Sequence, residues 1–428
     1  MSSWERFNTK LKQVLELPEL RNKILFTLGM FLIARAGSQI PAPGVDIIRL
    51  QQMVEGNDLL SFFNMFSGGA FGRVSIFALG VMPYINASII MQLMAVIVPK
   101  LDEIQKEGES GRQKITQWTR YLTIVISAIQ GFTACMWLQS VGLVTNPGFL
   151  FIVNTITVFT AGSVFLMWLG EQITVYGIGN GISLLIFLNI ISGMPSGYIQ
   201  AIQKFSGSKV LAPMLVFVVL ITIVVIWLIT VVQLGVRQVP VQYVGRGHSA
   251  GKSKVQQNTY LPIKVNVAGV MPVIFASVLM SLPIMLIQTL GDKLPAYYFM
   301  QRIFEQTHPV YLIIFAVLVV FFSFFYTAMM FDPEKIADNL KQSGGTVPGI
   351  RPGNETVEYL ESVVTKITWV GALFLAIISV APIYLFSVVG LPIFFSGTSI
   401  IILVGVGVDT IQQINAQLVM KNYKGFIK

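Results

Sequence analysis

The sequence has almost none of the side chains that form disulfides or bind transition metals. Its 428 residues include one cysteine, Cys135, and two histidines, His248 and His308, which lie far apart in predicted loops. A single cysteine excludes an internal disulfide framework, and so few thiol and imidazole groups cannot supply a zinc ligand set. We therefore expect no metal-dependent chemistry.

Charged residues are scarce as well. Asp, Glu, Lys and Arg make up 11% of the chain, whereas hydrophobic residues make up 54%, a composition typical of a membrane protein. Apolar runs close to the ~20 residues that cross a bilayer occur at roughly 24–40, 74–98, 120–139, 150–170, 182–202, 213–234, 266–290, 310–330, 367–387 and 398–418. The sequence thus predicts an all-α membrane protein with ten transmembrane helices.

The short motifs of common enzyme classes are also missing. We find no GxSxG elbow, no HExxH pair and no Walker loop. The ionisable residues inside the spans are Arg35, Glu171 and Asp409. Such residues mark ion pathways by default, but three scattered charges are more typical of structural or capping groups. An intramembrane enzyme is therefore disfavoured, and no catalytic, cofactor-binding or metal-binding residue is predicted.

Lys and Arg are distributed unevenly between the loops. Twenty-two of the 29 fall on one predicted side of the membrane and six on the other, with Arg35 inside the first span. The positive-inside rule then places both termini in the cytoplasm. It also explains the net charge of +9 without a nucleic-acid ligand. No cleavable signal peptide is expected, and the N-terminal segment predicts a charged amphipathic helix that ends at Pro18.

What the sequence does contain is an internal repeat. Residues 80–91, GVMPYINASIIM, recur at 269–280 as GVMPVIFASVLM, with eight of twelve positions identical. These segments begin the second and seventh spans. Because successive spans cross the membrane in opposite directions, two spans that are five apart have opposite orientations. The match therefore indicates an inverted-topology repeat, typical of proteins that move something across a bilayer. Coincidence is the alternative, because GxxP is common in membrane helices.

The repeat divides the chain into two halves of five spans, 1–205 and 206–428. Side chains such as Val81, Ile85 and Ile274 make their interface apolar. An apolar constriction seals or gates a pore, whereas an ion-coupled small-solute transporter requires polar ligands there; ordinary helix packing is the third explanation. Pro83 and Pro272 are expected to kink the two repeat helices, as suits a hinged pair that separates sideways.

A stretch before the second span is too short to cross the membrane and too apolar for water. It is LLSFFNMFSGGAFG, residues 59–72. A half-helix that re-enters the bundle fits, because irregular backbone at membrane depth needs surrounding protein or a water-filled cavity. An interfacial amphipathic turn is the alternative.

Two cytoplasmic loops are longer than topology requires. Loop 235–266 has five basic and no acidic residues, and loop 331–366 contains the turn PGIRPG with Arg351 at its tip. Positive-inside bias explains the charge of such loops but not their length. A positive field of this kind suits a large acidic partner or an RNA surface.

Several stretches together resemble one family, SecY, the channel subunits of the bacterial protein-conducting translocon. They are FNMFSGGAFGRVSIFALGVMPYINASIIMQL (63–93), EIQKEGESGRQKITQWTRY (103–121), FLMWLGEQITVYGIGNGIS (165–183), LPIKVNVAGVMPVIFAS (261–277), FFYTAMMFDPEKIADNLKQSGGTVPGIRPG (324–353) and GTSIIILV (397–404). The resemblance covers essentially the whole chain. It implies a clamshell of two five-helix halves around an hourglass pore.

The resemblance also implies roles for particular residues. A pore ring that closes around a translocating polypeptide would comprise Val81, Ile85, Ile182, Ile186, Ile274 and Ile402. A plug at 59–72 would fill the external funnel, with Phe62, Phe63, Asn64, Met65, Phe66, Ser67, Gly68 and Gly69 at its centre. Spans two and three against seven and eight would form a lateral gate, with Pro83 and Pro272 in its helices.

Partners follow from the same resemblance. Arg246 and Arg351 would dock the SecA motor ATPase and the ribosome, and small membrane subunits of the SecE and SecG type would accompany the channel. Signal sequences and unfolded secretory polypeptides would be the substrates, and the bacterial plasma membrane the location. No cofactor is implied. The first hypothesis is thus a passive gated polypeptide channel, and the alternative is a secondary transporter on the same architecture.

Overall fold

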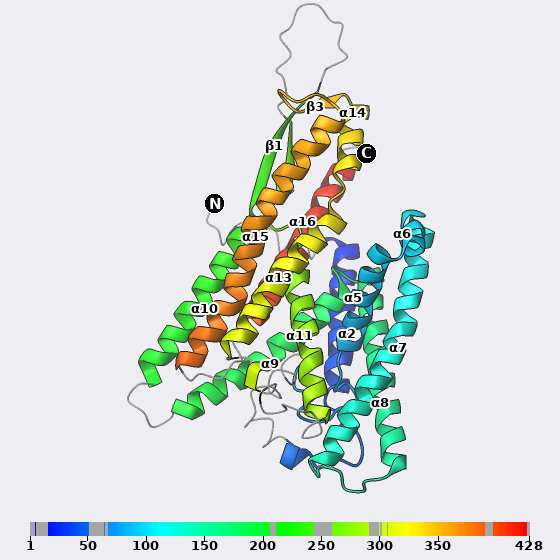
Figure 1. Cartoon of the computed structure of the whole chain (residues 1–428), viewed down its shortest axis with the longest axis vertical. Helices are drawn as coiled ribbons and strands as arrows, with labels where there is room; N and C mark the ends of the chain where they lie inside the picture. Colours follow the sequence, from blue (N-terminus) through cyan, green and yellow to red (C-terminus); the bar gives the residue numbers. More distant parts are fainter. Residues whose placement is uncertain are drawn as a thin grey trace, which may run out of the picture.

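The chain folds into a bundle of long helices with a small β-sheet at one end (Figure 1). The computed structural model describes Glu5, Asn64, Phe299 and the ranges 16–50, 67–205, 211–243, 259–290, 302–305, 307–389 and 397–425. The largest buried cluster contains residues from α2, α5, α8, α9, α10, α11, α13, α15 and α16, so it joins both halves of the chain.

Each of the ten predicted spans coincides with a helix. In chain order these are α2 (Pro18–Gly37), α5 (Met82–Ile97), α7 (Glu109–Ser140), α8 (Phe149–Tyr176), α9 (Gly181–Phe205), α10 (Leu211–Leu234), α11 (Met271–Leu290), α13 (Pro309–Met330), α15 (Asn354–Val389) and α16 (Gly397–Gly425). Long apolar runs become helices because a helix satisfies its backbone groups without water.

Length and composition alone qualify some of these helices as membrane spans. Within the described residues, α7, α8, α13 with its continuation, α15 and α16 are each long and apolar enough to cross a membrane. Helix α5 and the short α6 (Pro99–Lys106) would form a sixth span bent by 101°. Helices α9, α10 and α11 contain shorter apolar stretches.

Some predicted boundaries differ from the structure. The sequence predicts the second span from residue 74, but α5 begins at Met82 and residues 67–81 form mostly turns. Pro18 begins α2, and most of the N-terminal segment predicted as an amphipathic helix lies outside the described residues. Helix α15 starts at Asn354, well before the predicted residue 367, so it extends beyond the apolar run. Apolar runs locate the membrane-embedded part of a helix, not its ends.

The expected kinks at Pro83 and Pro272 are not formed. Each proline is the second residue of its helix, α5 or α11. In a first helical turn the missing N–H would have no intrahelical acceptor, and the fixed φ favours helix initiation. Both prolines therefore start straight helical turns. The prolines within helices are others, among them Pro283 in α11.

The two long loops form one small folded unit instead of two separate projections. Strand β1 (Val236–Tyr243) pairs antiparallel with β2 (Thr259–Lys264), and β3 (Gly345–Thr346) from the second loop pairs with the other edge of β1. Helix α14 (Pro333–Gln342) precedes β3. A separate apolar core holds the unit together, with Val239, Ile263, Val347, Leu360 and Val364 buried in it.

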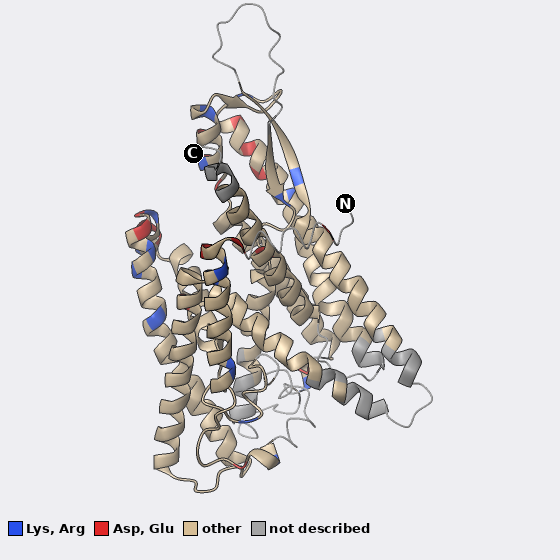
Figure 2. Cartoon of the chain, turned by 180° about the vertical axis from the view of Figure 1, so that it is seen from behind, with Lys and Arg blue, Asp and Glu red and all other residues tan. Residues whose placement is uncertain are grey.

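Charged side chains are concentrated at the end of the bundle that contains this unit. Figure 2 shows most of the Lys, Arg, Asp and Glu on α6, α14, the sheet and the adjoining helix ends, whereas the helical body has few. The positive-inside rule predicts that these segments face the cytoplasm.

Candidate functional site

The sequence repeat is also a repeat of local structure. Gly80 and Gly269 both adopt left-handed backbone angles, with φ of 60° and 64°. Glycine adopts this conformation without steric cost, so it can turn the chain sharply into a helix. The helices that follow, α5 and α11, run in opposite directions: α5 leads towards α6, and α11 leads away from the sheet (Figure 1).

The apolar side chains of the repeat occupy matching positions. The N–H of Ile85 donates to the carbonyl of Val81 at 3.1 Å, and the N–H of Ile274 donates to that of Val270 at 3.3 Å. Ile85 is 5% exposed and Ile274 2% exposed. The two isoleucines therefore have the same position in the first turn of two oppositely directed helices.

All six residues of the predicted ring belong to, or pack against, one extended buried cluster. Five are members of it and the sixth, Ile182, is partly buried and packs against it; the five are Val81, Ile85, Ile186, Ile274 and Ile402. They come from α5, α9, α11 and α16, and thus from both halves. Ile182 packs closely against α8, because a Cβ on Gly170 would lie 2.4 Å from its Cδ1.

The predicted plug is described only in part. Phe62, Phe63, Met65 and Phe66 lie outside the described residues. Within the rest, Asn64 organises the turn: its carbonyl accepts from the N–H of Gly69 at 2.7 Å and from Ser67 Oγ at 3.0 Å. Its side-chain Oδ1 accepts from the N–H of Gly72 at 2.7 Å.

Arg35 joins this turn to the helical body. Its Nη1 donates to the carbonyl of Gly68 at 2.8 Å and to Ser192 Oγ at 2.9 Å, so one guanidinium links α2, α9 and the end of the predicted plug. Ala70, two residues on, is fully buried in the cluster that contains the ring. The sequence predicts Arg35 to be a structural or capping group. Because this arginine lies inside an apolar span and a Gly-rich stretch follows in the sequence, a contact between Arg35 and that stretch could have been predicted.

The helices predicted to form the lateral gate are neighbours. Helix α11 contacts both α5 and α7 from the other half, and it also packs on α13. Phe275 of α11 makes edge-to-face contacts with Phe322 and Tyr326 of α13, with ring centroids 5.7 and 5.8 Å apart. Spans two and three therefore meet span seven, as expected. Pro83 and Pro272 lie at the starts of α5 and α11.

The structure describes one of the two residues predicted for docking. Arg246 lies outside the described residues. The Arg351 side chain is 88% exposed, on the turn between β3 and α15. Its backbone is fixed, because its carbonyl accepts from Thr356 Oγ1 at 2.9 Å and its N–H donates to Glu355 Oε2 at 3.3 Å. The turn therefore presents an exposed cationic side chain, with its Nη1 3.9 Å from Glu355 Oε1, on a held backbone.

The other two ionisable residues of the spans are both paired. Glu171 Oε1 accepts from Arg120 Nε at 2.8 Å, an ion pair between α8 and α7. Asp409 Oδ1 lies 3.9 Å from Lys264 Nζ. These pairs agree with the interpretation that the charges are structural.

Comparison with known proteins gives one result throughout. A SecY family model matches residues 75–411. The chain is 41% identical over 420 residues to the protein translocase subunit SecY of Haemophilus influenzae, covering 96% of this chain and 94% of that one. It is 42% identical over 433 residues to the subunit of the same name from Halalkalibacterium halodurans, covering 98% and 99%.

Solved structures share the fold at lower sequence identity. One described as a protein-conducting channel matches with a TM-score of 0.65 and 17% identity, over 92% of both chains. A SecY structure, described as one whose plug domain stabilises the closed channel, matches with a TM-score of 0.67 and 18% identity over the same shares. Canine Sec61 in a ribosome–channel complex matches with a TM-score of 0.62 and 17% identity, again over 92% of both chains. By the family match and the full-length identity, the chain belongs to the SecY family.

Proposed function

We propose that this chain is the protein-conducting channel of a Sec translocase in the bacterial plasma membrane. It passes unfolded secretory polypeptides across the bilayer and releases transmembrane segments sideways into lipid. The observation that supports this most strongly concerns the six residues of the predicted ring. These apolar residues, from α5 with its N-cap, α9, α11 and α16, belong to or pack against one buried cluster shared by both halves. Such a constriction seals against ions by excluding water and binds no particular side chain.

The plug and the gate complete the proposed closed channel. Residues 59–72 would fill the funnel on the external side, held at Gly68 by Arg35. The halves 1–205 and 206–428 would separate where α11 contacts α5 and α7. Since Pro83 and Pro272 begin these helices, the movement would occur at the glycine turns before them rather than at kinks within them.

The sheet end of the molecule is the proposed cytoplasmic docking surface. Exposed Arg237 on β1 and Arg351 beside β3 lie on the unit built from the two long loops, and Arg246 belongs to the same loop as β1. We propose the SecA motor ATPase and the ribosome as partners there, and subunits of the SecE and SecG type within the membrane. The termini would both be cytoplasmic, and no cofactor would be required.

The small-solute transporter, left open by the residues alone, finds no support. The relatives compared are translocase subunits, and the structures compared are protein-conducting channels. The charges that a coupled transporter would use are instead paired with neighbouring side chains.

The test is a cross-link from a translocating polypeptide to the ring. Because Cys135 is the chain's single cysteine, a Cys135→Ser background allows Ile85→Cys or Ile274→Cys to be probed alone. A secretory polypeptide with one cysteine, arrested by a folded C-terminal domain, should form a disulfide with either position. Ile90→Cys, on the same helix as Ile85 but 42% exposed, is the control and should not react. Equal reaction at Ile90, or none at the ring, would contradict the proposal.

A further inference from the structure

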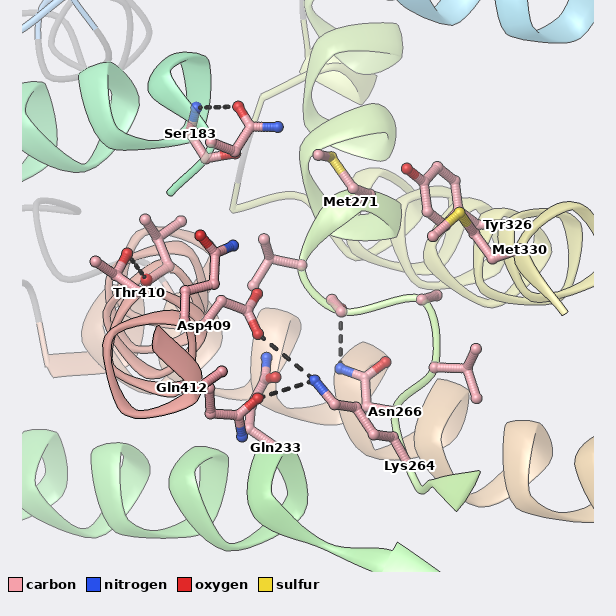
Figure 3. A pocket seen from close by; sticks show the side chains of 18 residues that line it. Ser183, Gln233, Lys264, Asn266, Met271, Tyr326, Met330, Asp409, Thr410 and Gln412 are labelled. Carbon is pink, nitrogen blue, oxygen red and sulfur yellow. Dashed lines mark hydrogen bonds and ion pairs between the residues drawn. The ribbon is translucent and has the colours of Figure 1, made fainter. Parts of the chain in front are cut away.

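A cavity of about 540 Å³ with a mixed polar and apolar lining opens on the side of the predicted ring that faces the β-sheet. It lies among α9, α10, α13, α16 and the connection from β2 to α11, so both halves contribute to it (Figure 3). Side-chain amides are its prominent polar groups: Asn180, Gln233, Asn266, Gln412 and Gln413. The sequence predicts apolar groups at the interface between the halves and does not predict this cavity.

One of these amides has an unmet hydrogen-bond donor. Gln233 is 5% exposed, and its Nε2 has no partner within the described residues. A buried donor without an acceptor is destabilising, and native structures rarely leave one unpaired. Figure 3 shows the Gln233 side chain converging with those of Lys264, Asp409 and Gln412 at the cavity. Gln233 Nε2 is therefore a buried donor in the cavity wall, unpaired in the described part of the chain, which an incoming acceptor oxygen can reach when the lining side chains shift.

The charges of the cavity compensate each other. Lys264 Nζ donates to Gln412 Oε1 at 3.0 Å and lies 3.9 Å from Asp409 Oδ1. A lining that holds one cation beside one anion favours neither an anionic nor a cationic ligand. The cavity lining therefore does not select a ligand by its net charge.

The cavity leads directly to the ring. Ser183, which lines it, follows the ring residue Ile182 in the first turn of α9. Val270, on the other side, accepts the hydrogen bond from Ile274. A segment held in the cavity would thus lie one helical turn from the constriction.

A side-chain amide has the same donor and acceptor groups as a peptide bond. An amide-rich, charge-balanced lining therefore matches a polypeptide main chain of any sequence. We propose that this cavity binds the main chain of an extended polypeptide segment just before it enters the ring, by hydrogen bonds to its peptide groups. The proposal rests on the proposed function as a polypeptide channel, and it adds where the substrate is held and by which of its groups.

The first experiment varies the segment that occupies the cavity. In the Cys135→Ser background, Gln413→Cys is cross-linked to polypeptides arrested with Ser/Gly, Lys, Glu or Pro runs beside their cysteine. Main-chain binding predicts similar yields for the Ser/Gly, Lys and Glu runs and a lower yield for Pro, which has no N–H. Yields that follow the charge of the run, or a Pro run that reacts as well as the others, would overturn the proposal.

The second experiment removes the free donor. Gln233→Leu should lower the yield at Gln413→Cys about fivefold, the effect of one neutral hydrogen bond. Gln139→Leu is the matched control: the Nε2 of Gln139 is also buried without a partner in the described part of the chain, but on α7 outside the cavity. It should leave the yield unchanged. Thermal unfolding of both variants tests whether they fold.

The ring cross-link separates this inference from the function on which it rests. Reaction at Ile85→Cys without reaction at Gln413→Cys would overturn the main-chain site alone. Failure at both positions would overturn the channel function as well. An unchanged yield in a folded Gln233→Leu variant would show that this donor does not hold the segment.

Discussion

Arg35 donates a hydrogen bond to the carbonyl of Gly68 over 2.8 Å, although the two residues are 33 positions apart. The same nitrogen donates to Ser192 Oγ on α9. A charge-assisted bond of this kind is stronger than a neutral one, and stronger still where water is excluded. The contact holds the end of the proposed plug beside the buried cluster that contains the predicted ring residues.

Replacing Arg35 by Met should release the plug. The variant loses two hydrogen bonds from a charged donor, each worth about 1.5–3 kcal/mol, so the resting ion conductance in planar bilayers should rise on the order of tenfold or more. Arg49→Met is the control, because Arg49 is exposed and, within the described residues, pairs with the nearby Asp46. Unchanged conductance in Arg35→Met would contradict a closing role for this residue.

Alanine substitutions at two adjacent glycines can distinguish a steric effect from a backbone-conformation effect at the same turn. A Cβ on Gly68 would lie 2.8 Å from Arg35 Nη1 and 3.0 Å from the Cα of Asn189, whereas one on Gly69 would have no atom within 4 Å. Both have positive φ, so each alanine variant meets the left-handed penalty of about 1–2 kcal/mol. Gly68→Ala should therefore raise the resting conductance more than Gly69→Ala. Equal effects would show that the turn conformation alone matters.

Polar groups in the ring should weaken the seal. The double variant Ile85→Asn, Ile274→Asn places hydrogen-bonding groups at two buried positions, 5% and 2% exposed, and so favours water in the constriction. Ion conductance of the resting channel should increase. The double valine variant keeps the site apolar and should stay close to the parent chain. A seal that tolerates both asparagines would exclude the gasket role.

Reversing the charge of Arg351 should impair docking without affecting the fold. The side chain is 88% exposed, and the turn is held by its backbone and by Thr356. Arg351→Glu should lower ATP-driven translocation in reconstituted vesicles on the order of tenfold through like-charge repulsion at the interface. Lys335→Glu, at a side chain 79% exposed on α14, tests whether any cation of this end has the same effect. Equal losses would assign the effect to the overall positive field.

Helix α8 depends on a glycine for close contact with the turn before α5. A Cβ on Gly162 would lie 1.9 Å from the carbonyl oxygen of Ile76, and backbone cannot yield as a flexible side chain can. Gly162→Ala should therefore destabilise the protein by about 1–3 kcal/mol or more, measured by thermal unfolding in detergent. Gly29→Ala in α2 meets no atom within 4 Å and should be neutral or slightly stabilising. Similar shifts in both variants would exclude this packing explanation.

Local patterns in the sequence predicted much of the fold. Ten apolar runs predict the positions of ten helices, and the GVMP repeat predicts that α5 and α11 are equivalent elements. The prediction that its two prolines kink the helices was wrong, because the turns at Gly80 and Gly269 place them at helix starts. The loop unit was missed, although alternation along β1, with Val239 and Val241 buried, was a usable signal.

The sequence by itself determined the membrane composition, the positions of the ten long helices among the described residues and the internal repeat, because these follow from hydrophobicity and residue identity read along the chain. Only the tertiary structure decided which distant residues meet. It joined Arg35 to Gly68, brought six ring residues from four helices to one cluster, and enclosed the amides around Gln233. Such contacts depend on how helices pack in three dimensions, and no local pattern encodes them.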